Sequence, residues 1–362
     1  MSNYIEFNDK IAFHPGYYIK EIIEESGLTQ EDFARRLDTT PKNLSILVRG
    51  EQSLSIDIAM KLSRMLDTSV VYWLNLQNEY DALLAETKSE EILEEERKLF
   101  KEIDYQYFCE YFNLPDLPRK TDEQIKAVRR FLNVATLTVL KQHNMAVKFR
   151  SASTGLSDTN IVKANIMVQI ATNIALKNKT VKYDKSKFEE AVDYALTLTD
   201  KHKSFLPLIQ DKFAKAGVIL VVLPNLAGSK INGAAKKIGN KIMIMVNDRG
   251  TYADTFWFTL FHEIGHVMNG DYGISFEKEV GSEETAANKY AAEKLIPEGL
   301  YQEFLNEGEY SVKSIKAFAK SIDRDPGIVV GRMQFDKIID HKNRSMNSLR
   351  EKYKVVNGNR GV

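Results

Sequence analysis

Two histidines and a glutamate in the C-terminal half of the chain have the types and spacing that metal-dependent hydrolysis requires. His262 and His266 are four residues apart, so on a helix both imidazoles leave the same face. Two imidazoles that converge on one point can hold a zinc ion, and Glu263 lies near enough to take a proton from a water activated there. A single histidine on an apolar helix is usually a core residue, but two that flank a glutamate are harder to explain in that way. The pattern therefore indicates a zinc peptidase.

A third ligand is needed, because zinc in a hydrolase normally keeps three protein ligands and one water. Glu284 is the first choice, since Asn288 lies four residues later on the same helical face, where it can bond to a metal ligand from behind. Glu283 is the main alternative; it is adjacent in sequence but about 100° round the helix. Two further carboxylates, Asp271 and Glu279, lie in the connection between the helices and are less favoured.

The chemistry that this set could perform is hydrolysis of a peptide bond, in which Glu263 takes a proton and passes it to the leaving amine. A predicted strand at Lys241–Val246 precedes the histidine helix and could pair with an extended substrate backbone. Val218–Leu223 is predicted as a second strand, so the two could equally well only build a small sheet. No oxyanion donor is singled out, although Tyr252 and Tyr272 are available.

The N-terminal 85 residues show the spacing of five short helices, of which the second and third form a helix-turn-helix. Thr29 is a good N-cap for the second helix, and Thr40 followed by Pro41 is a good start for the third. Only Leu37-Asp38-Thr39 separates these two helices, and in a helix-turn-helix the second one enters the major groove of DNA. The five expected helices begin near Gly16, Thr29, Thr40, Ser55 and Ser69.

The predicted third helix presents side chains that bond phosphates and base edges. The candidate DNA contacts are Gln30, Lys42, Asn43, Ser45 and Arg49. Residues 1–80 contain twelve acidic and eight basic side chains, a net charge of −4, which is unusual for a DNA-binding domain. A plain five-helix packing module that binds protein or nothing is therefore the alternative. We favour DNA binding because the basic side chains gather on or beside the predicted recognition helix.

The length and composition of the chain limit the number of domains, the binding partners and the cellular compartment that can be expected. The chain has 362 residues and no net charge, so two or three domains are expected and no global field attracts nucleic acid or an anionic membrane. The single cysteine, Cys109, rules out an internal disulfide and fits a reducing compartment. The N-terminus lacks the pattern of a signal peptide, and the longest aliphatic run, Val218–Leu223, is too short to span a bilayer. We expect a soluble, cytoplasmic protein with no membrane partner.

These patterns predict a mostly helical fold of the α+β class. Its parts would be a five-helix helix-turn-helix domain, a helical middle region, and a zincin-like domain with a small β-sheet and the histidine helix. The middle region begins with a charged helical connector at 86–104, and further helices are expected at 122–143, 157–175, 186–198 and 204–216. The predicted domains are 1–85 (DNA binding), 86–200 (connector or spacer), 201–340 (metallopeptidase) and 341–362 (flexible tail).

At this point the chain resembles two known families. The C-terminal half resembles the ImmA/IrrE family of zinc metallo-endopeptidases in the stretches Phe258–His266, Glu284–Pro297 and Pro326–Gln334. The N-terminal part is similar to HigA-type antitoxins of the XRE helix-turn-helix class, in the stretches Asn43–Gly50 and Tyr72–Tyr80.

The resemblance implies a gluzincin-like site in a bacterial or phage regulator. Its metal ligands would be His262, His266 and Glu284, with Glu263 as the catalytic base. The family often has a second acidic residue where Ala286 stands here. It also often ends its C-terminal Arg-Leu-Gln-His pattern with a histidine at the position of Phe335, and Arg332 would more readily form a structural salt bridge than approach the cleft.

Two functions of different kinds remain open. In the first, a DNA-bound regulator uses zinc to hydrolyse a peptide bond in a regulatory protein such as a repressor. In the second, the chain is a HigA-type antitoxin and autorepressor whose metallopeptidase-like domain is sensory or non-catalytic. The expected partners are a double-stranded DNA operator, either a protein substrate or a cognate toxin, and a second copy of the chain, because a helix-turn-helix usually reads two half-sites.

Overall fold

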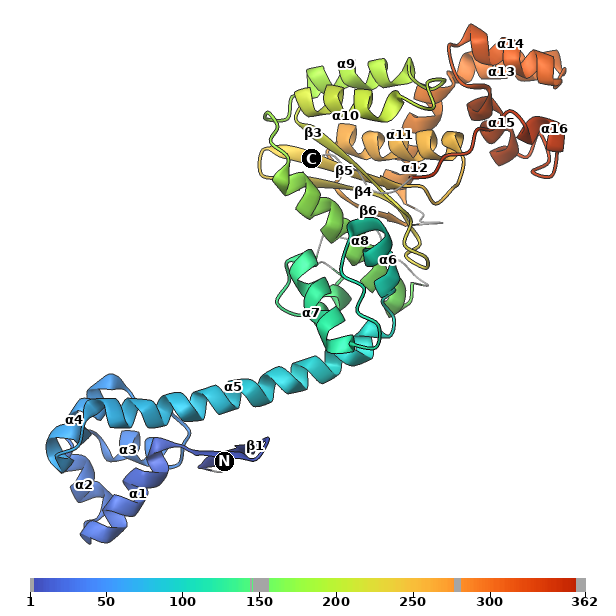
Figure 1. Ribbon diagram of the computed structural model, residues 1–362. Helices are drawn as coiled ribbons and strands as arrows, with labels where there is room; N and C mark the ends of the chain where they lie inside the picture. Colours follow the sequence, from blue (N-terminus) through green and yellow to red (C-terminus); the bar gives the residue numbers. More distant parts are fainter. Residues whose placement is uncertain (1–2, 144, 146–155, 277–280, 356–362) are drawn as a thin grey trace. The chain divides into compact units, whose positions relative to one another are not determined.

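The computed structural model describes residues 3–143, 145, 156–276 and 281–355. It divides into two compact units, Met1–Glu95 and Glu96–Val362 (Figure 1). The first unit contains a two-stranded sheet and the helices of the predicted helix-turn-helix region. The second combines helices with a four-stranded sheet, so the predicted fold class, mostly helical and α+β, is confirmed.

The N-terminal unit begins with a hairpin that the sequence analysis did not predict, followed by the five expected helices. Its elements are β1 (Tyr4–Phe7), β2 (Lys10–Phe13), α1 (Pro15–Ser26), α2 (Gln30–Arg36), α3 (Pro41–Val48), α4 (Ile56–Leu66) and the start of α5 (Val70–Phe100). The predicted caps Thr29 and Thr40 are present, and Ser55 is a third cap that was not predicted: each hydroxyl accepts a backbone N–H from the first turn of the helix that follows. The helices enclose a core around the fully buried Phe33, Leu44 and Trp73.

Helix α5 differs from the prediction, because it does not end before residue 86. It runs for 31 residues, and the expected charged connector is its continuation. The stretch lacks glycine and proline and is rich in strong helix formers, so nothing interrupts the helix. The boundary between the units falls inside it, at Glu95/Glu96, where the chain enters the second unit: buried Glu96 accepts the N–H of Leu137 at 2.7 Å and faces Arg129.

The middle helices belong to the second unit. They are α6 (Tyr105–Phe112), α7 (Thr121–Leu132), the 3-10 helix η1 (Leu137–Lys141), α8 (Asp158–Lys177), α9 (Lys185–Leu196) and α10 (Phe205–Lys215). The single helix expected at 122–143 is divided, because α7 ends at Asn133 in the left-handed conformation (φ 56°). The break expected at 150–155 lies outside the described residues. Phe188 and Val192 of α9 are buried in the same core as the sheet, so this region is more than a spacer.

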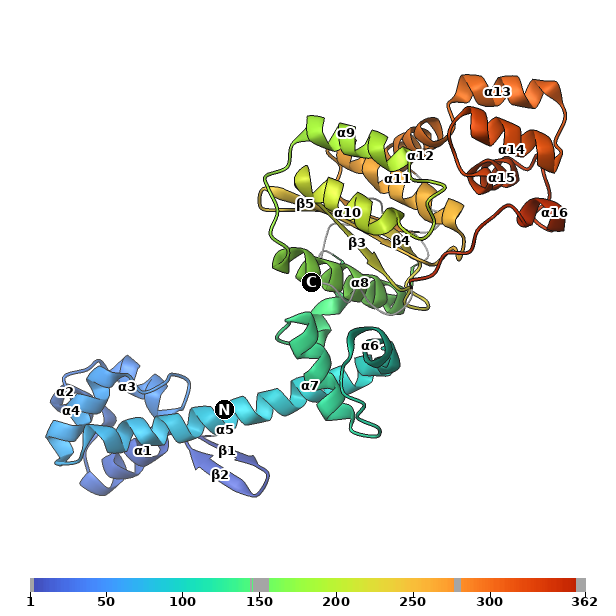
Figure 2. The same cartoon turned by 45° about the horizontal axis from the view of Figure 1, so that its top comes forward.

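The sheet has the strand order β3-β5-β4-β6, with β3 parallel to β5 and β4 antiparallel to both of its neighbours. Its strands are β3 (Val218–Leu223), β4 (Ile231–Ile238), β5 (Lys241–Asn247) and β6 (Gly273–Phe276). Helix α8 covers one face, and α10 lies with α11 on the other (Figure 2). The prediction that the strand before the histidine helix pairs with substrate is wrong: β5 lies between β3 and β4, and its backbone groups are already bonded on both sides.

The remaining helices carry and surround the candidate site. They are α11 (Ala253–Asn269), α12 (Ser282–Leu295), α13 (Glu298–Glu307), α14 (Val312–Ser321), α15 (Pro326–Phe335) and α16 (Arg344–Asn347). The flexible tail expected at 341–362 is instead packed over its described part: the Tyr353 ring packs against Phe256 in a tilted arrangement, and Lys352 forms a β-bridge with Tyr252. Among the helices of the described residues, none is both long and apolar enough to cross a lipid bilayer.

Candidate metal centre and DNA-binding face

Helix α11 positions the two histidines of the predicted zinc motif. His262 and His266 are one turn apart on it, and their Nε2 atoms approach each other to 3.0 Å. Both rings are buried, His262 being 7% exposed and His266 not exposed at all. The four-residue spacing of the two histidines therefore brings both imidazoles to one point on the same face of α11.

Helix α12 adds Glu284 to this point. Its two carboxylate oxygens lie 3.1 Å from Nε2 of His262 and 3.1 Å from Nε2 of His266. Within the described residues, these three side chains form a group whose ligand atoms all lie within 4.8 Å of one another. Glu283, the main alternative, is exposed to solvent. Glu279 lies outside the described residues.

Two oxygens behind the histidines fix which nitrogen faces the centre. Nδ1 of His266 lies 2.7 Å from the carboxylate of Asp271, and Nδ1 of His262 lies 2.9 Å from Oδ1 of Asn288. These oxygens can only accept, so each Nδ1 carries a hydrogen and each Nε2 is the nitrogen turned toward Glu284, where it donates when the ring is protonated and offers a lone pair to a cation when it is not. Two lone pairs 3.0 Å apart repel each other unless a cation or a proton lies between them. Two nitrogens and one carboxylate form the donor set that zinc takes in hydrolases, so the residues fit this metal.

Asn288 lies where the sequence analysis placed it, behind the candidate ligand His262, whereas the position of Asp271 was missed. Helix α11 ends in a Schellman motif: Gly270 adopts φ 75° and its N–H bonds to Val267, while the N–H of Asp271 bonds to the carbonyl of His266. This turn folds the Asp271 carboxylate back onto the His266 ring. Gly270 directly after an apolar helix was the sequence signal that could have indicated it.

The electrostatics of the buried trio are those of a tightly coupled ion pair. Burial alone would raise the pKa of Glu284, but hydrogen bonds from His262 and His266 lower it to about 2. Burial alone would lower the pKa of His262, but the hydrogen bond to Glu284 and the charge of Glu263 raise it above its ordinary value. In the metal-free protein, Glu284 is therefore held as a carboxylate ready to accept a cation.

Glu263 lies beside this trio, with no exposed surface. Its side chain fits against strand β4 at Gly233, where an added Cβ would lie 2.5 Å from Oε1 of Glu263. The glycine is therefore required by space, because any larger residue would displace the carboxylate. Gly265, inside the histidine motif, is also required by space. A Cβ at this position would lie 3.1 Å from Cα of Ala287, so the glycine allows α12 to approach α11 closely.

Removing the carboxylate behind His266 is expected to weaken metal binding. The substitution Asp271→Ala should lower zinc affinity by about 10- to 100-fold, because the orientation and basicity of His266 are then no longer fixed. Competition with a chromophoric chelator measures this directly. The matched control is Asp340→Ala, an exposed aspartate in another part of the unit. Equal affinities in the two variants would contradict the role assigned to Asp271.

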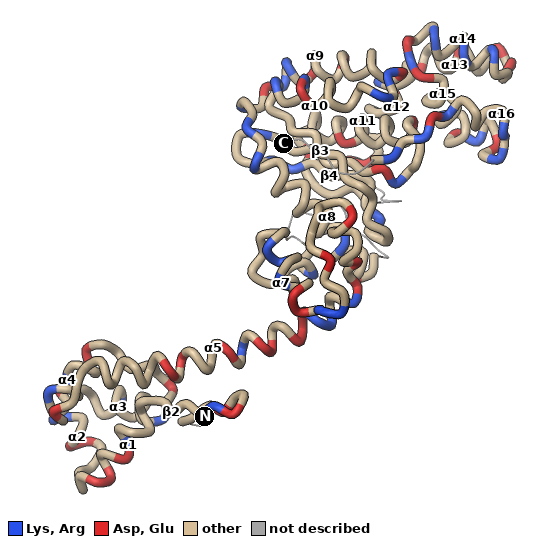
Figure 3. The backbone as a smooth tube through the Cα atoms, viewed as in Figure 1, with Lys and Arg blue, Asp and Glu red and all other residues tan. Residues whose placement is uncertain are grey.

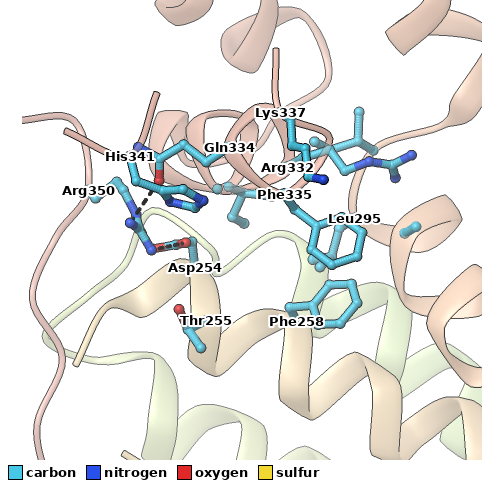
Figure 4. A pocket seen from close by; sticks show the side chains of 14 residues that line it. Asp254, Thr255, Phe258, Leu295, Arg332, Gln334, Phe335, Lys337, His341 and Arg350 are labelled. Carbon is cyan, nitrogen blue, oxygen red and sulfur yellow. Dashed lines mark hydrogen bonds and ion pairs between the residues drawn. The ribbon is translucent and has the colours of Figure 1, made fainter. Parts of the chain in front are cut away.

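A cavity lies beside the N-terminal half of α11, and Phe258, one turn before His262, lines it (Figure 4). Arg332 lines it but also forms salt bridges to Asp336 (2.6 Å) and Glu298 (3.2 Å), the structural use that the sequence analysis favoured. Of the two tyrosines considered as oxyanion donors, Tyr252 lies under the guanidinium of Arg350, 4.0 Å from it. No contact places either tyrosine at the trio among the described residues.

The predicted DNA contacts lie at the second and third helices. Gln30 opens α2, while Lys42, Asn43 and Ser45 lie on α3 and Arg49 caps its C-terminus. Over the N-terminal unit, basic and acidic residues are interspersed rather than gathered on separate faces (Figure 3). Lys42 is exposed and forms no ion pair with any residue that the structure describes, so it is free to meet a phosphate.

Two of these side chains are held in place by neighbours. Arg49 donates to Ser45 at 2.6 Å and to both oxygens of Glu51 at 2.8 and 3.0 Å, and the hydrogen bond from Arg49 lowers the pKa of Glu51. Asn43 accepts a hydrogen bond from Gln52 at 3.1 Å, a residue that the sequence analysis did not include. The face therefore offers oriented polar groups, and Lys42 is an exposed cation on it that forms no ion pair with a described residue.

Two parts of the chain match known protein families. Residues 19–73 match the family described as helix-turn-helix, and residues 219–321 match the peptidase family described as IrrE N-terminal-like domain. The second match runs from β3 to the end of α14 and so contains His262, Glu263, His266 and Glu284.

Individual relatives are similar over short stretches. The chain is 37% identical over 79 residues to the HTH-type transcriptional regulator YddM of Escherichia coli (strain K12), a match that covers 21% of this chain and 84% of that protein. It is 30% identical over 86 residues to virulence-associated protein I of Dichelobacter nodosus, covering 24% of this chain and 80% of that protein. Among solved structures, the Pseudomonas aeruginosa protein PA4674 in complex with its operator DNA (28bp) is 30% identical, with a TM-score of 0.22, over 23% of this chain and 93% of that one.

Proposed function

Because this chain belongs to the helix-turn-helix transcriptional regulators and carries an IrrE-like peptidase domain, we propose that it is a DNA-binding regulator that cleaves a protein. The C-terminal unit would be a zinc-dependent endopeptidase, and its substrate a regulatory protein such as a repressor. The observation that carries this proposal is the convergence of three buried ligands, His262, His266 and Glu284, beside a buried glutamate.

In the proposed reaction, zinc and the side chains of the protein would have separate roles. His262, His266 and Glu284 would hold zinc, which when bound polarises a carbonyl and lowers the pKa of water to near 7. Asp271 and Asn288 keep the two imidazoles in the tautomer that presents Nε2. Glu263 would accept a proton on its carboxylate and return it to the leaving amine, and the wall at Gly233 holds that carboxylate in place.

The proposal is tested by making cleavage depend on the metal. Protein loaded with zinc and protein stripped by a chelator are incubated separately with a mixture of bacterial regulatory proteins, and new N-termini are identified by mass spectrometry. We expect termini that appear with zinc, vanish on chelation and return when zinc is restored. Elemental analysis accompanies the assay, and a protein purified without chelators that contains and binds no metal would overturn the enzymatic proposal.

The second candidate is a HigA-type antitoxin and autorepressor in which the metallopeptidase-like domain senses or stabilises without cleaving. The complete burial of Glu263 and His266 favours it, because a substrate must reach the centre for hydrolysis. The two candidates share DNA binding and differ in whether Glu263 is needed. We favour the peptidase because a site that only stabilises has no use for a buried carboxylate beside its ligands.

DNA binding is proposed through α3, with a homodimer reading two operator half-sites. The substitution Lys42→Ala should weaken binding by a similar factor for every DNA sequence tested, because Lys42 would contact a phosphate rather than a base. The slope of the logarithm of the binding constant against the logarithm of the salt concentration should fall in magnitude by about 1. Arg49→Ala should weaken binding too. The control is Lys20→Ala, an exposed lysine on α1. Gel shifts at two salt concentrations measure all three, and unchanged shifts for Lys42→Ala and Arg49→Ala would remove α3 from the interface.

A further inference from the structure

The cavity beyond Phe258 has a volume of about 380 Å³ and is built by three helices and the C-terminal segment (Figure 4). Helix α11 contributes Phe258, α12 contributes Ala292 and Leu295, and α15 contributes Phe335. This volume is that of a site for one large side chain or a small ligand.

The cavity and the metal trio share the same two helix faces. On α11, Phe258 precedes His262 by four residues, and on α12, Ala292 follows Asn288 by four. Because His262 faces Glu284 and Asn288 while Phe258 faces Ala292 across the cavity, the two helices run antiparallel along one another. The ring centroids of Phe258 and His262 are 6.5 Å apart. The cavity therefore lies about one helical turn from the trio.

The walls of the cavity are mostly apolar. Phe258, Phe335 and Leu295 line it together with Ile296 and Ile328, and the polar part of the lining includes Asp254, Arg332, Lys337 and Arg350 (Figure 4). Phe335 is 78% exposed, which leaves a large aromatic ring in water at the cavity mouth. An exposed ring beside an apolar hollow indicates a surface that binds something apolar.

Asp254, Arg332 and Arg350 line the cavity as members of ion pairs, whereas Lys337 and His341 also line it but are exposed to solvent, so the buried walls do not call for a charged occupant. Arg350 bonds to both carboxylate oxygens of Asp254 at 3.0 and 2.7 Å and to Gln334 at 3.0 Å. Gly331 lets α15 press directly on Asp254. Burying a further charge here would leave it without a partner, which is unfavourable. An uncharged side chain fits the lining better.

We propose that this cavity receives a large apolar side chain, preferably aromatic, of the substrate residue next to the bond that is cleaved. Successive residues of an extended peptide are about 3.3–3.6 Å apart, so a peptide bond held at the trio places a neighbouring side chain within reach of the cavity. This assignment rests on the proposed peptidase function and adds its substrate preference.

A binding measurement tests the cavity without catalysis. N-acetyl-phenylalaninamide and N-acetyl-alaninamide are titrated into metal-free protein and followed by saturation-transfer NMR. The wild type should bind the phenylalanine probe at least tenfold more tightly than the alanine probe. The substitution Ala292→Trp fills the cavity and should remove this preference, whereas Ala286→Trp, an exposed alanine on the same helix, should not. Phe335→Ala alters an exposed side chain, so the fold is retained, and it should weaken the phenylalanine probe several-fold.

A cleavage profile separates the two proposals. Zinc-loaded wild type and variants are incubated with a peptide library, and the sequences around each cut are determined. We expect enrichment of Phe, Tyr, Leu or Met at one position beside the cut, and a shift towards Ala and Gly in Ala292→Trp. Metal-dependent cuts without any apolar preference, or with the same profile in Ala292→Trp, overturn the cavity assignment alone. Probe binding without any cuts overturns the peptidase function and the assignment that rests on it.

Discussion

Replacing Glu263 with glutamine is expected to slow peptide hydrolysis by about 10²- to 10⁴-fold while zinc stays bound, because the variant loses its proton acceptor. The amide has nearly the same shape as the carboxylate, so it fits the space that Gly233 leaves. Neither His262 nor His266 is altered, and metal content should match the wild type. Initial rates on a peptide that the wild type cleaves measure the loss, with elemental analysis of the same samples.

The control for this prediction is Glu283→Gln, which makes the same change on an exposed carboxylate of α12. That variant should keep the wild-type rate. If Glu263→Gln hydrolyses as fast as the wild type, Glu263 is not the base. If the wild type cleaves no peptide, and if wild type and Glu263→Gln repress equally in cells, the hypothesis of an antitoxin replaces that of a peptidase.

The second large effect is expected on metal binding itself. Glu284→Gln removes the negative charge that faces the two histidines, so zinc affinity should fall by about 100-fold or more, since even a lost partner behind a ligand lowers affinity by about 10- to 100-fold. Zinc at 1,000 times its dissociation constant stabilises a folded protein by about 4.1 kcal/mol. The rise in melting temperature on adding zinc should therefore be much smaller in this variant.

Glu283 again supplies the matched comparison, because it neighbours Glu284 in sequence and was the alternative ligand. Glu283→Gln should keep both the affinity for zinc and the thermal shift. A large loss of affinity in Glu283→Gln, together with wild-type behaviour of Glu284→Gln, would exchange the two assignments. Metal stoichiometry and thermal unfolding with and without zinc decide between them.

Local patterns were sufficient for most helices. The caps at Thr29 and Thr40 depend on contacts within three residues, so the sequence indicates them directly. The family matches at residues 19–73 and 219–321 confirm the helix-turn-helix and the IrrE-like domain. Strand β4 was missed because Lys236 and Lys237 interrupt its apolar pattern, and β6 was missed because it has four residues.

The sequence by itself determined the pairing of His262 with His266, because their separation equals one helical turn and a helix of any tertiary context keeps it. Only the tertiary structure decided that Glu284 joins them and Glu283 does not, since that choice depends on which face of α12 packs against Gly265. The placement of Asp271 behind His266 and of β5 inside the sheet was decided in the same way. Contacts within a turn follow from residue spacing, whereas contacts between elements follow from which of several possible faces becomes buried.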